Sequence, residues 1–288
     1  MLFNKPLTDI IKQRFSCRTY LRKPFDSDTF ARLTDFIASD QDGPLGNRTR
    51  FELVSATEAD AKALRGLGTY GFIKGATGFI VGALCENESA LEDYGYLMEL
   101  IILKAADLGL GSCWLGGTFT KSRFAKKIAL NADEIIPAVT SVGYAAQNPR
   151  WVDGKIRAAA GSDRRLPWDK LFFDGGFDTP LSKDVADVYA MPLEMVRLGP
   201  SASNRQPWRI VKDGDDLHFY LRRTRGYRTN NYAKMLKMDD LQRIDMGIAM
   251  CHFELTLQGL GIDGRWVVND PGIATPNELT EYSVSWVE

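Results

Sequence analysis

The sequence contains two segments that each occur twice, in the same order, in its two halves. A Gly-Pro turn with an Asn-Arg pair before an expected strand is found at Gly43–Val54 and again at Gly199–Val211. A segment that starts Asp-x-Gly, has helical spacing and ends Gly-Leu-Gly is found at Asp93–Gly111 and at Asp245–Gly261. The offset is 157 residues for the first pair and about 150 for the second. This near-constant offset predicts an internal duplication; the alternative is a chance likeness of amphipathic helices that end in glycine.

Composition narrows the class of protein. The chain has 288 residues, 44 % of them apolar and 25 % charged, which is ordinary for a soluble globular protein. Its 36 Lys+Arg and 37 Asp+Glu give a net charge of −1, which argues against a broad surface for nucleic acid. We expect no membrane segment, because the apolar run of residues 78–85 is too short to span a bilayer, and no signal peptide.

The cysteines and histidines are few and scattered. Cys17, Cys85, Cys113 and Cys251 form no Cys-x-x-Cys pair, and the two histidines are His218 and His252. We therefore expect free thiols in a cytoplasmic protein, no structural metal site, and no Ser–His–Asp triad.

Hydrophobic spacing and turn signals predict an α+β protein. Helices are predicted over Leu7–Arg14, Ser27–Ser39 with Asp26 or Ser27 as the N-cap, Glu58–Leu67, Leu91–Leu108, Met191–Leu198 and Leu241–Gln258. Strands are predicted over Arg50–Ala56, Thr77–Leu84, Ala138–Tyr144, Trp208–Lys212 and Leu217–Leu221. Residues 148–180, rich in Pro, Gly, Asp and Arg, are expected to form a long connection rather than a core element.

Two basic segments are candidates for binding a phosphate. In an extended chain, Arg14, Ser16 and Arg18 point to one side, where they can converge on a dianion through charge-assisted hydrogen bonds. Arg164 and Arg165, inside the long connection, can complete such a pocket. The alternative for both segments is an ordinary solvated turn.

Two turns are candidates for binding a flat ligand. In Gly199–Trp208, small residues allow backbone N–H groups to approach a ligand closely, and Ser and Asn add polar edges. In Gly109–Gly117, glycines leave the backbone exposed after a buried helix, so that an N–H there can face a ligand. The alternatives are an Asx-rich turn before a strand and a glycine-rich loop with a packing role only.

Together these segments resemble the nitroreductase superfamily of FMN-dependent oxidoreductases, and within it the single-chain subgroup in which two half-units are fused. The matching motifs are Arg-x-Ser-x-Arg at 14–18, Pro-Ser-x-x-Asn-x-Gln-Pro-Trp at 200–208, Gly-Leu-Gly-Ser with a following glycine at 109–117, and Arg-Leu-Pro at 165–167. The resemblance implies a nitroreductase-like fold in which two half-units form a pseudo-dimer within one chain. The predicted parts are a first half at 1–165, a connection at 166–190 and a second half at 191–288.

The resemblance also implies a role for each site residue. Arg14, Ser16 and Arg165 hold the FMN phosphate, and Arg18 reaches the ribityl chain or the pyrimidine O2 edge. The flavin is lined from the second half by Pro200, Ser201, Ala202 and Asn204. Leu115, Gly116 and Gly117 lie beside the ring, with a backbone N–H near N5.

The chain departs from the family in the order of its motifs. The usual early Pro-Ser-x-x-Asn turn is degenerate here, at residues 44–50, and the intact copy lies in the second half. We therefore expect one site per chain, built from both halves, a second, symmetry-related site that does not function, and a monomer.

The implied function is an NADH- or NADPH-dependent oxidoreductase that reduces a small electron-poor compound, nitroaromatic or quinone-like, by ping-pong hydride transfer through flavin N5. No side chain is assigned as a catalytic acid or base. Three alternatives remain open: a non-catalytic flavin sensor or carrier, a specialised reductase such as a dehalogenase on the same fold, and, more distantly, a flavin-free protein with degraded sites.

Overall fold

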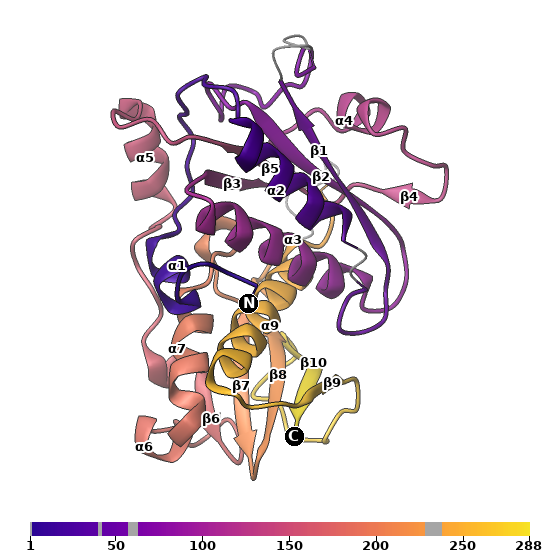
Figure 1. Cartoon of the computed structure of the whole chain (residues 1–288). Coiled ribbons are helices and arrows are strands. Elements are labelled where there is room, and N and C mark those ends of the chain that lie inside the picture. The colour runs from indigo at the N-terminus through magenta and orange to yellow at the C-terminus, as the bar shows by residue number, and fades with distance from the viewer. Residues whose placement is uncertain (1, 40–41, 57–62, 228–237) are drawn as a thin grey trace.

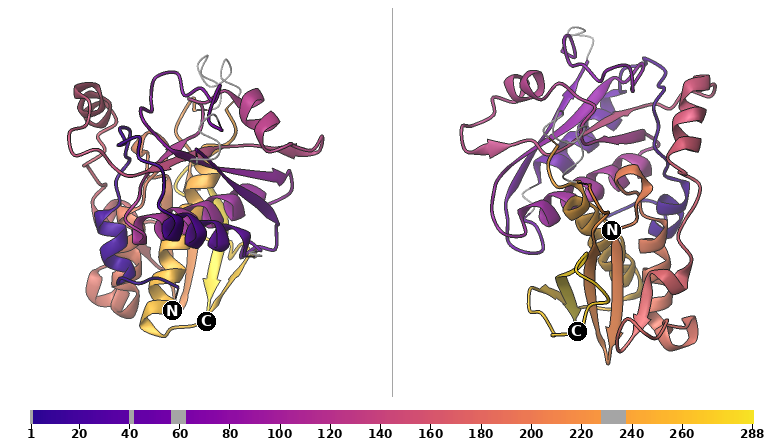
Figure 2. Two further views of the ribbon diagram at one scale, coloured as in Figure 1. Left: turned by 45° about the horizontal axis from the view of Figure 1, so that its top comes forward. Right: turned by 180° about the vertical axis from the view of Figure 1, so that it is seen from behind.

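The computed structural model describes residues 2–39, 42–56, 63–227 and 238–288. Two sheets lie at opposite ends of the molecule, and the long helices α3 (Ala90–Asp107) and α9 (Leu241–Leu260) cross between them (Figure 1). Figure 2 shows the same crossing from two further sides. Within the described residues, no helix has both the length and the apolar character needed to span a membrane.

The described strands of the first half form an antiparallel sheet. Its order is β1-β2-β5-β3, with β4 pairing to β2. The strands are β1 (Thr49–Ser55), β2 (Gly78–Cys85), β3 (Gly111–Leu115), β4 (Glu134–Ile135) and β5 (Val139–Gly143). Strand β2 is buried along almost its whole length, because α3 covers one face of the sheet and a smaller apolar cluster covers the other. A strand covered on both faces has a continuous apolar sequence instead of an alternating one.

The described strands of the second half, together with β6 from the connection, form a sheet of order β6-β7-β8-β10-β9. The strands are β6 (Phe172–Asp174), β7 (Trp208–Asp213), β8 (Asp216–Arg222), β9 (Arg265–Val267) and β10 (Thr280–Val287). Neighbours are antiparallel except for β6 and β7. Strands β7 and β8 form a hairpin at Gly214, where a positive φ of 60° makes glycine favourable.

The shorter helices surround this frame. They are α1 (Leu7–Gln13), α2 (Ser27–Ala38), α4 (Lys121–Lys127), α5 (Trp151–Ala159), α6 (Lys183–Ala186) and α7 (Ala190–Leu198). Helix α2 begins at Asp26, whose side chain accepts a hydrogen bond from the Thr29 N–H. Helix α1 belongs by sequence to the first half, but Ile10 and Ile11 pack into the core of the second. The chain then passes from one half to the other directly after α1.

The crossing of α3 and α9 depends on a pair of glycines. A Cβ added to Gly95 would lie 2.1 Å from the carbonyl oxygen of Ile244, and one added to Gly247 would lie 1.9 Å from that of Glu92. Each residue of one contact is 152 positions from its counterpart in the other (95 and 247, 92 and 244), so the two contacts are related by a pseudo-twofold axis. The duplication indicated by the sequence is therefore present in the fold, which is α+β as predicted.

Most of the predicted elements are confirmed within one or two residues, including the long helices that form α3 and α9. The prediction of an exposed glycine loop over 109–117 is wrong in part, because residues 111–115 form β3. The prediction of a connection without core elements over 148–180 is also wrong: it contains α5 and β6, and Leu171 and Phe172 are fully buried. The first half of the predicted helix at 58–67, residues 58–62, lies outside the described residues; in the second half, 63–66 form a turn.

Candidate functional site

A cavity of about 700 Å³ lies between the two halves of the chain. Every residue to which the resemblance gives a role lines it, which brings together four segments that are far apart in the chain. These residues are Arg14, Ser16, Arg18, Leu115, Gly116, Gly117, Arg165, Pro200, Ser201, Ala202 and Asn204. Arg164, the other candidate of its pair, does not line the cavity.

The segment after α1 runs along the edge of β3. Ser16 pairs with Ser112 in a parallel bridge, and Cys17 N–H donates to the Ser112 carbonyl at 2.8 Å. Because this stretch is extended, alternate side chains point the same way. Arg14, Ser16 and Arg18 therefore line the cavity, while Cys17 is buried.

Arg14 forms an ion pair with Glu99 of the central helix α3. Its Nε lies 3.7 Å from Oε1 of Glu99, which is fully buried. Glu99 also accepts a hydrogen bond from Trp114 Nε1 at 2.7 Å and lies 3.1 Å from His252 Nε2. Among the described residues, Nη1 of Arg14 has no hydrogen-bond partner although it is buried. A buried guanidinium donor without a partner is costly, so this atom marks a place for an acceptor that the described residues do not supply.

Arg165 brings a second cation to the same wall. Its Nη1 donates to the Ser162 carbonyl at 2.8 Å and to Asn204 Oδ1 at 3.3 Å. Burial, and then the positive charge of Arg14, lower the pKa of Arg165. Two cations brought close together in a partly buried wall favour the binding of an anion.

The turn of residues 199–207 has a strained backbone. Ser203, Asn204 and Gln206 have φ values of 51°, 53° and 49°, which are uncommon for residues other than glycine. Hydrogen bonds hold this conformation: Asn204 Nδ2 donates to the carbonyls of Gly161 (2.7 Å) and Arg164 (2.9 Å), and Gln206 N–H donates to Ser201 Oγ (2.8 Å). Strain of this kind is often found at ligand sites.

The opposite wall comes from the end of β3 and from α9. A Cβ at Gly116 would lie 2.2 Å from Cδ1 of Leu241, so this loop packs closely against the Leu241 side chain of α9. Leu241, Ile244 and Ile248 form an apolar stripe of α9 along the cavity, and Asp245 lies within it.

The sequence reasoning missed the contribution of the helices to this cavity. Besides the stripe of α9, the cavity is lined by Ile156 and Arg157 of α5 and by Ala160 directly after it, as well as by Phe72, Tyr227 and Met238. The stripe of α9 has the same three-and-four spacing as a buried core helix, so the spacing gave no signal of a cavity. Helix α5 lies in the stretch that was expected to be a connection.

Comparisons with known proteins settle the family. A family model described as "Putative TM nitroreductase" matches residues 6–257. The chain belongs to this nitroreductase family. Comparison with curated proteins gave no match.

Comparison with solved structures also gave matches. A "putative nitroreductase" from Thermotoga maritima is 18 % identical with a TM-score of 0.58, over 98 % of this chain and 93 % of that one. A "putative nitroreductase" from Desulfovibrio desulfuricans in complex with FMN is 20 % identical with a TM-score of 0.40, over 52 % of this chain and 95 % of that one. A nitroreductase with bound FMN from Bacteroides fragilis is 21 % identical with a TM-score of 0.40, over 51 % of this chain and 92 % of that one.

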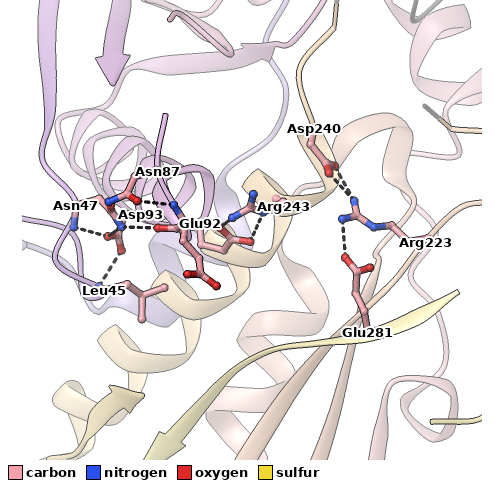
Figure 3. Close-up of polar contacts among 10 residues, drawn as sticks. Leu45, Asn47, Asn87, Glu92, Asp93, Arg223, Asp240, Arg243 and Glu281 are labelled. Carbon is pink, nitrogen blue, oxygen red and sulfur yellow. Dashed lines mark hydrogen bonds and ion pairs between the residues drawn. The ribbon is translucent and has the colours of Figure 1, made fainter. Parts of the chain in front are cut away.

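The first-half copy of the turn, residues 43–47, is bound to α3. The Asp93 carboxylate accepts the N–H groups of Leu45 at 2.9 Å and of Asn47 at 2.8 Å, together with the Asn47 side-chain amide at 2.9 Å (Figure 3). A Cβ at Gly43 would lie 2.1 Å from Asp93 Cγ, so the turn packs directly on this carboxylate.

Next to Asp93, α3 is joined to α9 by an ion pair. Arg243 donates both Nε and Nη2 to Glu92, at 2.7 and 2.6 Å (Figure 3). Ile244 of α9 is the duplicate of Glu92, and it lines the cavity. At this duplicated position, the first half has the charged Glu92, paired with Arg243, where the second half has the apolar Ile244 in the cavity wall.

Proposed function

We propose that this nitroreductase family member binds one FMN per chain in the cavity between its halves. We further propose that it uses NADH or NADPH to reduce a small electron-poor compound, nitroaromatic or quinone-like. The observation that carries the proposal is Nη1 of Arg14, which is buried and has no hydrogen-bond partner among the described residues. It lies beside a second cation, Arg165, in a cavity lined by residues of all four motifs of the resemblance.

The residues present fit FMN. Its phosphate is a dianion, and Arg14, Ser16 and Arg165 offer two guanidinium groups and a hydroxyl on one wall. Its flat ring needs an apolar wall, which α9 supplies, and polar groups at its edges, such as the turn around Asn204. A volume of about 700 Å³ lies within the usual range for ligand pockets.

The side chains would bind and orient the cofactor, which itself supplies the two-electron chemistry when bound. Arg14 and Arg165 would fix the phosphate end, and Arg18 the ribityl chain or the pyrimidine edge. Gly116 and Gly117 would leave the backbone free to approach the ring, and Leu241 would exclude water from it. Because no side chain here is assigned as an acid or a base, protons would come from solvent.

We also propose that the site is complete in a monomer, because both of its walls come from one chain. The parts would be the halves 1–165 and 191–288, joined by residues 166–190, of which β6 pairs with the second sheet. Light scattering of the purified protein tests this: a dimer that loses FMN on dilution would contradict it.

The first experiment is a visible spectrum of the purified protein and a titration of the apoprotein with FMN. We expect a yellow protein that binds about one FMN per chain and is bleached anaerobically by NADH or NADPH. A quinone or a nitroaromatic compound should then restore the colour. Two FMN per chain would show that the second site is intact. A yellow protein that neither nicotinamide bleaches would be a flavin carrier, and a colourless protein that ignores FMN would refute the proposal.

A further inference from the structure

The aspartates that begin the two Asp-x-Gly helices have different environments. Asp93 and Asp245 are 152 positions apart, the same offset as Gly95 and Gly247, so they are duplicates of one residue. Both oxygens of Asp93 accept hydrogen bonds from the first-half turn. In Asp245, Oδ1 accepts the Ala202 N–H at 2.9 Å, but among the described residues the buried Oδ2 has no partner.

The length of the turn explains the difference. Two residues separate Pro44 from Asn47, whereas three separate Pro200 from Asn204. In the longer turn the Asn204 N–H donates to the Ser201 carbonyl at 2.9 Å instead of to the aspartate. The Asn204 side-chain amide also points away, to the carbonyls of Gly161 and Arg164. Oδ2 of Asp245 is therefore left without a hydrogen bond from the turn.

The surroundings of Asp245 favour its neutral acid. The residue is 2 % exposed and lies in the apolar stripe of α9. Within the described part of the chain, no cation lies within ion-pair distance of it. Burial strongly raises the pKa of Asp245, the negative charge of Asp240 raises it further, and the single N–H of Ala202 opposes this. A buried carboxylate without a cation is costly, whereas its protonated form carries an O–H that can donate a hydrogen bond.

We propose that Asp245 acts as a neutral carboxylic acid that donates a hydrogen bond from the cavity wall to a ring acceptor of the bound isoalloxazine. This inference rests on the proposed function, because it takes FMN as the ligand. The ring has carbonyl oxygens and nitrogens as acceptors, and their electron density increases on reduction. A fixed donor therefore binds the reduced ring more strongly than the oxidised one, as preorganised donors do wherever charge develops.

Two substitutions at this position separate donor from acceptor. Asp245→Asn keeps an acceptor for the Ala202 N–H and presents an N–H donor in place of the O–H. Asp245→Leu has a similar size and neither group. The control is Asp93→Asn, which weakens the equivalent contact between helix and turn outside the cavity.

The measurements are the affinity for oxidised FMN and the midpoint potential of the bound flavin. We expect Asp245→Asn and Asp93→Asn to stay within about threefold of the unmodified protein in affinity, with a nearly unchanged potential. Asp245→Leu should bind reduced FMN on the order of tenfold more weakly relative to oxidised FMN, which lowers the potential. If Asp245→Asn loses as much as Asp245→Leu, Asp245 acts as a charged acceptor, and the inference is wrong.

Infrared difference spectra provide a second test that needs no apolar variant. Addition of FMN to the apoprotein should shift a carboxylic acid C=O band that is absent from Asp245→Asn. If there is no such band, the inference is wrong while the proposed function stands. If the unmodified protein binds no flavin at all, the proposed function fails, and this inference falls with it.

Discussion

Nε of Arg14 lies 3.7 Å from Oε1 of Glu99, and the two side chains are 6 % and 0 % exposed. Glu99 belongs to the central helix α3 and is also bound to Trp114 of β3 and in contact with His252 of α9. One buried carboxylate thus joins the cationic wall of the cavity, the strand that leads to Gly116, and the helix that forms the apolar wall. The geometry of the site depends on this group although it does not itself line the cavity.

Removal of the Glu99 carboxylate should destabilise the whole fold. In Glu99→Ala, the buried charge of Arg14 and the N–H of Trp114 lose their partner, and loss of one partner from a buried pair costs about 3–5 kcal/mol. The control is Glu194→Ala, which breaks a partly exposed pair with Arg197 and should cost less than about 1 kcal/mol. Urea denaturation measures both, and equal losses would contradict the central role of Glu99.

Arg14 should distinguish a phosphorylated flavin from an unphosphorylated one. We expect Arg14→Gln to weaken FMN binding about 10- to 100-fold, because charge-assisted hydrogen bonds are worth about 1.5–3 kcal/mol. Riboflavin, which lacks the phosphate, should bind both proteins equally. Arg32→Gln, on the exposed surface of α2, is the control and should leave both affinities unchanged. An equal loss for FMN and riboflavin would place the phosphate elsewhere.

The two glycines of the helix crossing should not tolerate a methyl group. In Gly247→Ala, the new Cβ would lie 1.9 Å from the backbone oxygen of Glu92, so α3 and α9 must move apart. We expect a loss of about 2–3 kcal/mol in unfolding free energy, the usual cost of overpacking. Gly259→Ala, on the same helix with open space around it, should instead stabilise the protein by up to about 1 kcal/mol. Thermal unfolding of both variants gives the comparison.

Part of the acid sensitivity of the fold should come from Glu134. Arg50 donates two hydrogen bonds to Glu134, at 2.8 and 2.7 Å. These hydrogen bonds lower the pKa of Glu134 from 4.5 to about 2. Since the folded state has the lower pKa, the stabilisation is complete above pH 4.5 and is lost as the pH falls toward 2.

Glu134→Gln should therefore remove a stabilisation of about 1 kcal/mol at neutral pH and flatten the loss between pH 4.5 and 2. Arg50→Leu should flatten most of it, because the main cause of the lowered pKa is removed while the Asn131 N–H still donates to Glu134. Glu278→Gln, on an exposed loop, should leave the profile as it is. Unfolding curves at a series of pH values test this, and an unaltered slope in Glu134→Gln would contradict it.

Local signals were sufficient for most of the fold. The apolar spacing of α3 and α9 and the buried run of β2 are strong because burial itself produces them. Short elements were not predicted, because they have too few residues to show a pattern. Strand β6 has three residues, and its pairing with β7 is set by tertiary contacts. Strand β3 was taken for a loop because its flanking glycines suggested one, whereas pairing with β5 holds it extended.

The candidate site was predicted where a residue pattern carries chemistry, and missed where it does not. Arg14, Ser16 and Asn204 belong to recognisable motifs, and they line one cavity. Asp245 was noticed only as part of a repeated helix start. Among the described residues its Oδ2 has no hydrogen-bond partner, because the turn that contains Asn204, some forty positions earlier, is one residue longer than its first-half copy. This difference is found only when the two halves are compared in the structure.

The crossing at Gly95 and Gly247 also bears on how such a chain can evolve. In an assembly of two identical subunits, each substitution appears on both sides of the axis, and a change that helps one side must be tolerated by the other. Here the axis relates residues that mutate independently. The two halves can therefore diverge one position at a time. Asp93 binds the first-half turn, whereas its duplicate Asp245 lies in the cavity wall with one oxygen that has no partner among the described residues.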